Sequence, residues 1–193
     1  MSEVSYEGKR ELVELLKTKP YLFGKALGFS RLTELNNEWI VDMVFGDGDE
    51  TLQAHRGSYK TTCVSIALVL IIILFPNEKT KFFRKTDSAV KEIIRQVSKM
   101  LKHPVTQRIV KALWGVELKI LKDSANEITT NLPNDPRGTS QLCASGFKSS
   151  MTGQHYDRIF TDDIVTLEDR ISKAERDATI NSYYELKNIV NPT

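Results

Sequence analysis

The feature that most constrains the fold is a run of apolar residues from Cys63 to Phe75, in which Ser65 is the one polar member. A transmembrane helix needs about 20 consecutive apolar residues, so this run, which Pro76 ends, is too short to cross a bilayer. A helix that is apolar on every side must instead be covered on every side by protein. The run therefore predicts a core helix packed between a sheet and other helices.

A polar loop precedes this helix and has the composition of a phosphate-binding loop. The loop, Ala54 to Thr62, follows a segment at 51–53 for which we expect a short strand. Backbone N–H groups in such a loop, together with the positive end of the following helix, bind phosphate oxygens. In this arrangement Lys60 neutralises the β- and γ-phosphates of a nucleotide, and the Thr61 hydroxyl binds magnesium.

The loop departs from the usual pattern G-x-x-x-x-G-K-[ST] at both of its glycines. Ala54 stands at the first glycine position and Tyr59 at the second, directly before the lysine. Glycine is used there because the backbone bends sharply and approaches the phosphates. Gly57 supplies some of that freedom, but Tyr59 must adopt a glycine-like conformation with a large side chain. The alternative is that residues 60–62 only open a helix whose first turn is solvated.

A second candidate motif lies about a hundred residues later, where a short apolar strand within 156–163 ends in Asp162 and Asp163. In a nucleotide site the first acid holds the water shell of magnesium and the second polarises the attacking water. Glu168 is an alternative base, although its place also suits the first turn of a helix that starts at about Leu167. A helix cap or a solvated turn is the alternative for the acid pair.

The remaining pattern alternates helices and strands, which predicts an α/β sandwich with a largely parallel sheet. Asp87 or Ser88 is expected to cap the helix that runs to about Lys102. Arg84, Lys85 and Lys148 are interpreted as a solvated basic face, with contact to DNA as the alternative. We expect helices at 7–17, 21–29, 32–45, from the cap at 87 or 88 to about 102, at 104–114 and from about 167 through 186. Strands are expected at 79–85, 116–122, 126–131, 141–147 and 156–161, of which 116–122 and 126–131 form a hairpin.

Composition indicates an ordinary globular chain of one domain. The 193 residues are 40% hydrophobic and 27% charged, and the net charge of +2 gives no sign of a strongly basic surface. Cys63 and Cys143 form no pair motif, which favours a reducing, cytoplasmic setting. His55, His103 and His155 show no metal-ligand spacing.

Together these motifs resemble the large terminase subunits of tailed bacteriophages, the ATPases that drive DNA into the prohead. The loop is similar to the deviant Walker A motif of that family, in which an arginine, here Arg56, stands four residues before the lysine. The resemblance runs from about Trp39 to the carboxyl end, through the stretches Phe83–Asp87, Ser150–Asp157, Asp162–Asp163, Asp169–Ser172 and Tyr183–Leu186.

The resemblance implies a P-loop NTPase fold of the ASCE type that uses ATP and Mg²⁺. Lys60 and Asp163 are then catalytic, with Arg56 as the residue that stabilises the γ-phosphate. Thr61 and Asp162, the Walker B aspartate, hold the metal. The nucleotide-binding residues are Arg56, Gly57, Ser58, Tyr59, Lys60, Thr61 and Thr62.

Under this resemblance the whole chain, residues 1–193, is a single ATPase domain, with a helical segment at 1–45 and the ATPase core at 46–193. No part of it matches the family's nuclease domain, and we expect the core to stop before its last strands. The implied partners are double-stranded DNA, the terminase small subunit, the portal and prohead, and further copies in a ring, with no membrane. Asn36, Asn37 and Gln53 are candidates for reading adenine. A helicase-like ATPase and a non-catalytic nucleotide-binding or structural module remain open alternatives.

Overall fold

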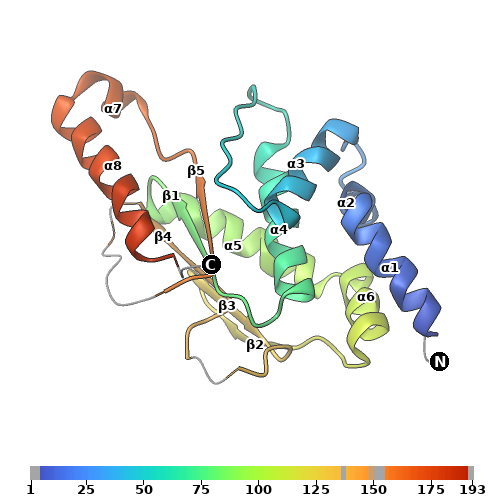
Figure 1. The fold of residues 1–193 in the computed structure, drawn as a ribbon. Coiled ribbons are helices and arrows are strands. Elements are labelled where there is room, and N and C mark those ends of the chain that lie inside the picture. Colours follow the sequence, from blue (N-terminus) through green and yellow to red (C-terminus); the bar gives the residue numbers. More distant parts are fainter. Residues whose placement is uncertain (1–4, 136–137, 148, 150–154, 191–193) are drawn as a thin grey trace. The chain divides into compact units, whose positions relative to one another are not determined.

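The computed structural model describes residues 5–135, 138–147, 149 and 155–190 (Figure 1). The chain divides into two compact units, each of which is described by itself. The first contains Met1–Leu74 and Gln96–Lys119, and the second contains Phe75–Arg95 and Ile120–Thr193.

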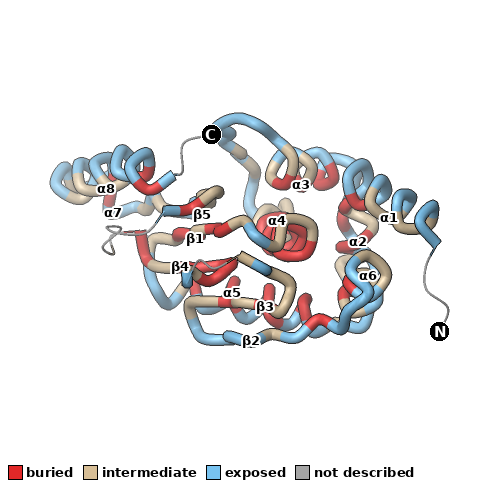
Figure 2. The backbone as a smooth tube through the Cα atoms, turned by 60° about the horizontal axis from the view of Figure 1, so that its bottom comes forward, coloured by how far each residue is buried: buried red, intermediate tan, exposed pale blue. Residues whose placement is uncertain are grey.

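The first unit is helical. Its longest apolar element, α4, is buried from Cys63 to Ile73 (Figure 2), so the predicted core helix is confirmed. No helix in the described parts of the chain combines the length and the apolar character that crossing a bilayer requires. The helices are α1 (Tyr6–Thr18), α2 (Pro20–Ala26), α3 (Glu34–Phe45), α4 (Lys60–Leu74), the carboxyl-terminal part of α5 (Asp87–Lys102) and α6 (Pro104–Trp114).

Three contacts within this unit hold helices around α4. At Gly24 of α2, an added Cβ would lie 2.6 Å from a side-chain atom of Ile66, which shows how closely α2 approaches α4. The helix α3 packs along α4, and from α6 the Trp114 Nε1 donates to the Ile73 carbonyl at 2.8 Å. Asn37 joins α3 to two further helices. Its Nδ2 donates to the Thr18 carbonyl at the end of α1, and its Oδ1 accepts from the Tyr21 N–H at the start of α2.

The second unit is built on a five-stranded mixed sheet in the order β2-β3-β4-β1-β5. β1 pairs in parallel with both β4 and β5, whereas β3 is antiparallel to both β2 and β4. The hairpin expected for the strands at 116–122 and 126–131 is confirmed by the antiparallel pair of β2 and β3. The expectation of a largely parallel sheet is corrected, because β3 also pairs antiparallel with β4. The strands are β1 (Thr80–Arg84), β2 (Ile120–Asp123), β3 (Glu127–Thr130), β4 (Leu142–Gly146) and β5 (Arg158–Asp162).

The strand expected at 51–53, ahead of the loop, is not formed, and residues 49–55 have no regular secondary structure. Thr51 and Gln53 are exposed and Leu52 is half-buried. One partly covered apolar side chain gives little burial to offset the entropy of ordering a strand.

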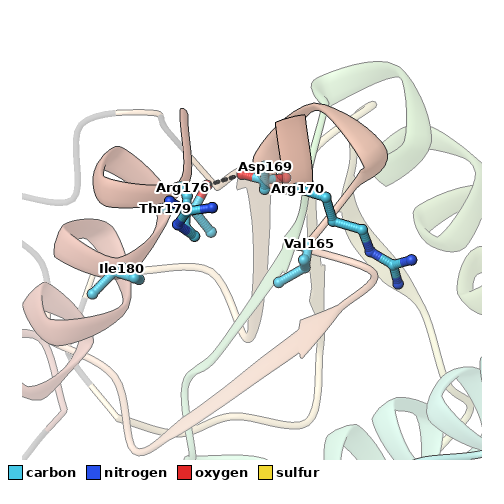
Figure 3. Close-up of a pocket in the computed structure, with 6 residues that line it drawn as sticks. All are labelled: Val165, Asp169, Arg170, Arg176, Thr179 and Ile180. Atoms are coloured by element: carbon cyan, nitrogen blue, oxygen red, sulfur yellow. Dashed lines mark hydrogen bonds between the residues drawn. The ribbon is translucent and has the colours of Figure 1, made fainter. Parts of the chain in front are cut away.

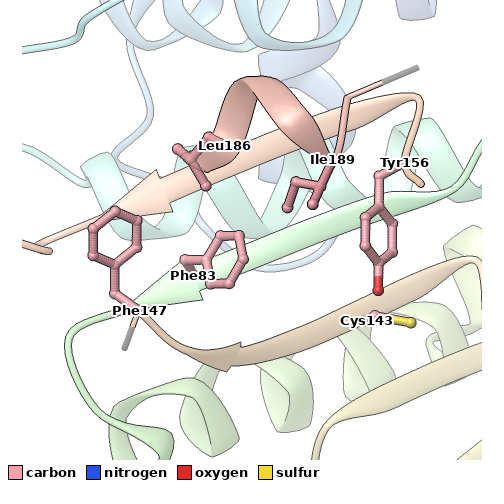
Figure 4. Close-up of a cluster of buried hydrophobic side chains, with 6 residues drawn as sticks. All are labelled: Phe83, Cys143, Phe147, Tyr156, Leu186 and Ile189. Atoms are coloured by element: carbon pink, nitrogen blue, oxygen red, sulfur yellow. The ribbon is translucent and has the colours of Figure 1, made fainter. Parts of the chain in front are cut away.

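One face of the sheet is covered by the end of the chain (Figure 4). Phe83 of β1 and Phe147 meet edge to face with ring centroids 5.7 Å apart. After α7 (Leu167–Ile171) and α8 (Lys173–Glu185), the short 3₁₀ helix η1 (Leu186–Asn188) brings Leu186 and Ile189 onto this cluster, which also includes Cys143 and Tyr156.

The amino terminus of α5 differs in detail from expectation. Thr86, rather than Asp87 or Ser88, caps the helix, because its Oγ1 accepts from the Ala89 N–H at 3.3 Å. Asp87 instead accepts from the Gly146 N–H at 2.6 Å and so ties α5 to the end of β4. That bond depends on two segments far apart in the sequence.

The end of α6 gives a test of local structure. Gly115 follows the helix with φ of 73°, a left-handed conformation that costs an L-residue about 1–2 kcal/mol. We expect Gly115→Ala to lower the free energy of unfolding by about 1 kcal/mol, measured by urea denaturation. Gly48→Ala is the matched control, since Gly48 is exposed, lacks a positive φ and has open space for a Cβ; an equal loss in both variants would contradict the explanation.

Candidate functional site: a loop before α4 and the acidic end of β5

The backbone of the loop bends at the positions where the sequence predicts strain. Gly57 has φ of 86° and Tyr59 has φ of 63°. Helix α4 begins at the next residue, Lys60, and the Tyr59 carbonyl accepts from the Cys63 N–H at 2.9 Å. Tyr59 therefore adopts the left-handed conformation that glycine would take without strain, at a cost of about 1–2 kcal/mol. Strain of this kind is concentrated at functional sites.

The side chain of Asn36 holds this loop in place. It is 5% exposed, and its Nδ2 donates to the Ser58 carbonyl at 3.1 Å. Its Oδ1 accepts from the Thr33 N–H at 3.0 Å and from the Thr33 hydroxyl, so one side chain both caps α3 and fixes the loop. The sequence gives a partial signal, since Thr33-x-x-Asn36 is a capping pattern, but not the bond to Ser58.

These contacts bear on the adenine-reading candidates. The amide groups of Asn36 and Asn37 are both committed to backbone contacts. Gln53 is exposed, and its assignment to adenine stays a prediction.

The loop also has features that suit an anion. The Ser58 Oγ is buried and has no hydrogen-bond partner among the described residues, and a Cβ built on Gly57 meets open space. Lys60, Thr61 and Thr62 are half-buried in the first turn of α4, where the helix dipole is positive, and Arg56 is exposed. The Ser58 hydroxyl, the first backbone N–H groups of α4 and the Lys60 ammonium group are all hydrogen-bond donors of the kind that bind phosphate oxygens.

Cys63, one turn into α4, is not a candidate nucleophile. Burial raises the pKa of its thiol to about 12, against a smaller lowering by a hydrogen bond with Asn36. The thiol is therefore protonated at neutral pH, when a nucleophilic cysteine needs the thiolate.

Asp162, at the end of β5, is bound by an arginine. Arg84 and Asp162 face each other across the parallel pair β1 and β5. The Asp162 Oδ2 accepts from the Arg84 Nη2 at 2.9 Å and from its Nε at 3.1 Å, and Asp162 is 4% exposed. The interpretation of Arg84 as part of a solvated basic face is therefore wrong, because parallel strands end at the same edge and bring these two charges together.

Asp163 has a different environment. Its side chain is 66% exposed and lies 3.9 Å from the Arg84 Nη2, and its backbone has φ of 49°. Glu92 of α5 also approaches Arg84, at 3.9 Å. Arg84 thus faces three carboxylates, of which only Asp162 is deeply buried.

A magnesium ion is compatible with these oxygens only in a limited way. The Thr61 hydroxyl of the first unit and the Asp162 carboxylate of the second unit are each an oxygen group of the kind that Mg²⁺ prefers. Among the described residues, however, no three His, Cys, Asp or Glu side chains are grouped to hold a metal. Arg84 already binds Oδ2 of Asp162. The Asp162 carboxylate is therefore better suited to hydrogen-bond the water shell of a magnesium ion than to coordinate the ion directly.

Lys85 forms a second buried ion pair that the sequence analysis missed. Its Nζ donates to both Asp169 oxygens, at 2.7 and 2.8 Å, and to the Thr179 hydroxyl at 3.1 Å. Asp169 also accepts from the Thr166 N–H at the start of α7. These bonds attach α7 and α8 to the end of β1. The expectation that Lys85 is solvated is therefore wrong. Glu168 is exposed in the first turn of α7, the position predicted for a helix-starting acid.

A pocket of about 350 Å³ lies between α7 and α8 (Figure 3). Asp169 and Thr179 form part of its wall and are hydrogen-bonded to each other at 2.6 Å. It contains none of the residues that the sequence predicts for nucleotide or metal binding. The full lining is Val165, Asp169, Arg170, Arg176, Thr179 and Ile180.

Lys60 lies in the first unit and Asp162 in the second, so their meeting at one nucleotide stays a prediction. Of the stretches that carry the terminase resemblance, residues 150–154 lie outside the described part of the chain, and so does Lys148 of the expected basic face. Comparison with protein-family models and with curated proteins finds no match to this chain.

The pair of Arg84 and Asp162 can be tested by unfolding. Arg84→Ala leaves a buried carboxylate without its partner, which typically costs about 3–5 kcal/mol. We expect a much smaller loss for the double variant Arg84→Met and Asp162→Leu, because it removes both charges and keeps most of the volume. Urea denaturation of both variants measures the difference, and a double variant that loses as much stability as Arg84→Ala would contradict the pairing.

The Asp169 cluster predicts a pH effect. The hydrogen bond from Lys85, followed by that from Thr179, holds the pKa of Asp169 well below its usual range, despite an opposing effect of burial. Its stabilising contribution is therefore present above the unfolded-state pKa of about 3.9 and is lost as the pH falls through the lower folded-state pKa. In urea denaturation, wild type should exceed Asp169→Asn in stability at pH 7, and the difference should shrink below about pH 4. Asp177→Asn, at an exposed position of α8, should match wild type throughout, and a gap for Asp169→Asn that persists unchanged at low pH would contradict the assignment.

Proposed function

We propose that this chain is an ATP-hydrolysing domain of the terminase type, which powers packaging of double-stranded viral DNA. The observation that carries the proposal is the left-handed Tyr59 directly before Lys60 at the start of a buried helix. A large residue is held in a strained, glycine-like conformation next to a lysine. Strain at this position is expected where the backbone must bend to bind phosphate.

In this proposal the first unit binds the triphosphate. Loop N–H groups and the unpaired Ser58 hydroxyl donate to phosphate oxygens, and Lys60 offsets the charge that develops on the β- and γ-phosphates. The exposed Arg56 stabilises the γ-phosphate. Asn36 keeps the loop in its bent conformation through the Ser58 carbonyl, so little reorganisation is needed when the nucleotide binds.

The second unit supplies the acids. Asp163, exposed at the end of β5, orients and deprotonates the water that attacks the γ-phosphorus in line. The Asp162 carboxylate and the Thr61 hydroxyl would hold a magnesium ion, the carboxylate through the water shell of the ion. Such an ion would neutralise charge that develops on the phosphates. Arg84 keeps the Asp162 carboxylate oriented.

The terminase assignment within ATPases is supported by the motifs that resemble that family, above all Arg56 with Lys60 and the pair Asp162–Asp163. From the same resemblance come the proposed partners: duplex DNA, a small terminase subunit, the portal of the prohead and further copies in a ring. A helicase-like motor would share the same core.

A non-catalytic module is the second candidate function. Two observations favour it: the strand that normally feeds a phosphate-binding loop is not formed at 51–53, and Asp162 is already paired with an arginine. Such a module would bind nucleotide without turnover.

Steady-state ATP hydrolysis by the purified chain, with and without duplex DNA, tests the proposal. We expect Lys60→Ala to lower turnover by at least about 100-fold, the usual effect of removing one group that stabilises transition-state charge. Asp163→Asn should abolish turnover but retain nucleotide binding, because its side chain is exposed and its loss leaves the fold intact. Asp162→Ala should also abolish turnover.

The matched controls are Lys17→Ala and Asp177→Ala, which remove an exposed lysine and an exposed aspartate on α1 and α8. Both should hydrolyse ATP at the wild-type rate. Nucleotide binding without hydrolysis by wild type would favour the non-catalytic module, and absence of binding would reject the phosphate-binding loop.

A further inference from the structure

The outer face of α5 carries an uncompensated line of positive charge. Lys91, Arg95 and Lys99 are exposed and stand four residues apart, so they follow one face of the helix over about 12 Å, at 1.5 Å per residue. These three residues, Lys91, Arg95 and Lys99, are called the stripe below, and they all lie on the single helix α5.

The opposite face of α5 is buried, which fixes the direction in which the stripe points. The side chains that share this face are almost completely covered: Val90, Ile93, Ile94, Val97, Met100 and Leu101. The cations therefore face outward, and α5 has no apolar face left to insert into a lipid surface.

Nearby acids do not neutralise the stripe. Between Glu92 and Glu117 the sequence has no acidic residue and five basic ones: Arg95, Lys99, Lys102, Arg108 and Lys111. Glu92 approaches Arg84, and Asp87 accepts from Gly146. Lys91, Arg95 and Lys99 form no ion pair with any carboxylate in the described residues. In a chain with a net charge of only +2, this is a local concentration of one sign.

We propose that the stripe binds the phosphate backbone of duplex DNA without sequence preference. A row of cations on a rigid helix complements a linear polyanion, whose phosphates repeat along each strand, better than it complements a compact acidic patch. The major groove of B-DNA, about 12 Å wide, admits an α-helix, and long basic side chains reach phosphates on its edges. The choice of duplex DNA as the polyanion rests on the proposed packaging function. The charge and exposure of the stripe are independent of that proposal.

The test measures fluorescence anisotropy of a fluorescein-labelled 30-base-pair duplex with the full chain, in the absence of nucleotide. For three phosphate contacts, the plot of log affinity against log salt concentration should lose about 2.7 units of slope when Lys91, Arg95 and Lys99 are replaced together by glutamine. At about 50 mM salt the affinity of this triple variant should fall at least about ten-fold.

The matched control replaces Arg10, Lys17 and Lys19, exposed cations of the first unit that are interspersed with Glu7, Glu11 and Glu14 in the sequence. It makes the same change in net charge and should keep the wild-type affinity and salt slope. Unchanged thermal unfolding of both variants shows that the fold is retained.

Three results would overturn the proposal: no DNA binding by wild type, an equal loss in the stripe variant and the control, or binding of phosphatidylserine vesicles that the stripe variant loses while DNA binding is unchanged. The ATPase proposal fails separately. Lys60→Ala should bind DNA as wild type does. DNA binding by the stripe can therefore be confirmed even if the chain does not hydrolyse ATP, and it can be refuted even if the chain is an active ATPase.

Discussion

The cover of α4 is the constraint on which the first unit depends. An all-round apolar helix has no surface that tolerates water, so neighbouring helices must approach it on several sides. The close approach at Gly24, the packing of α3 and the bond from Trp114 to the Ile73 carbonyl show how this is done. Because α4 is fixed by its core contacts, its first turn is fixed as well. The loop that ends at Lys60 is therefore presented by a rigid element, which is what a binding site requires.

In the second unit, the parallel pairing of β1 with β5 has the corresponding role. Parallel strands bring their carboxyl ends to the same edge of the sheet, and here those ends are Arg84 and Asp162. A buried carboxylate needs a partner, and the guanidinium supplies one. The next residue of the chain, Lys85, does the same for Asp169 and so ties α7 and α8 to the sheet. Two adjacent basic residues thus organise the end of the sheet instead of contacting solvent.

These two arrangements divide the proposed chemistry between them. The loop offers donors and positive charge suited to phosphate, and the end of β5 offers one buried, oriented acid and one exposed acid. Asp162 and Asp163 differ in exposure, and we propose different roles for them. Asp162, buried in an ion pair, is suited to holding a metal ion in position, whereas the exposed Asp163 carboxylate is accessible to the attacking water. The cationic stripe of α5 adds a surface whose partner is defined by charge and is independent of the nucleotide.

Much of this was determined by the sequence alone. The apolar run required a buried helix, Pro104 and Gly115 marked both ends of α6, and the position of Tyr59 in a glycine pattern predicted its positive φ. Each of these follows from local backbone sterics or from hydrophobic periodicity, which neighbouring residues decide. The tertiary structure alone decided the partners of Arg84, Lys85 and Asn36, the antiparallel pairing of β3 with β4 and the absence of a strand at 51–53. Pairing between residues about 80 positions apart, such as Arg84 with Asp162, depends on strand order and register, and a single sequence does not encode these in any local pattern.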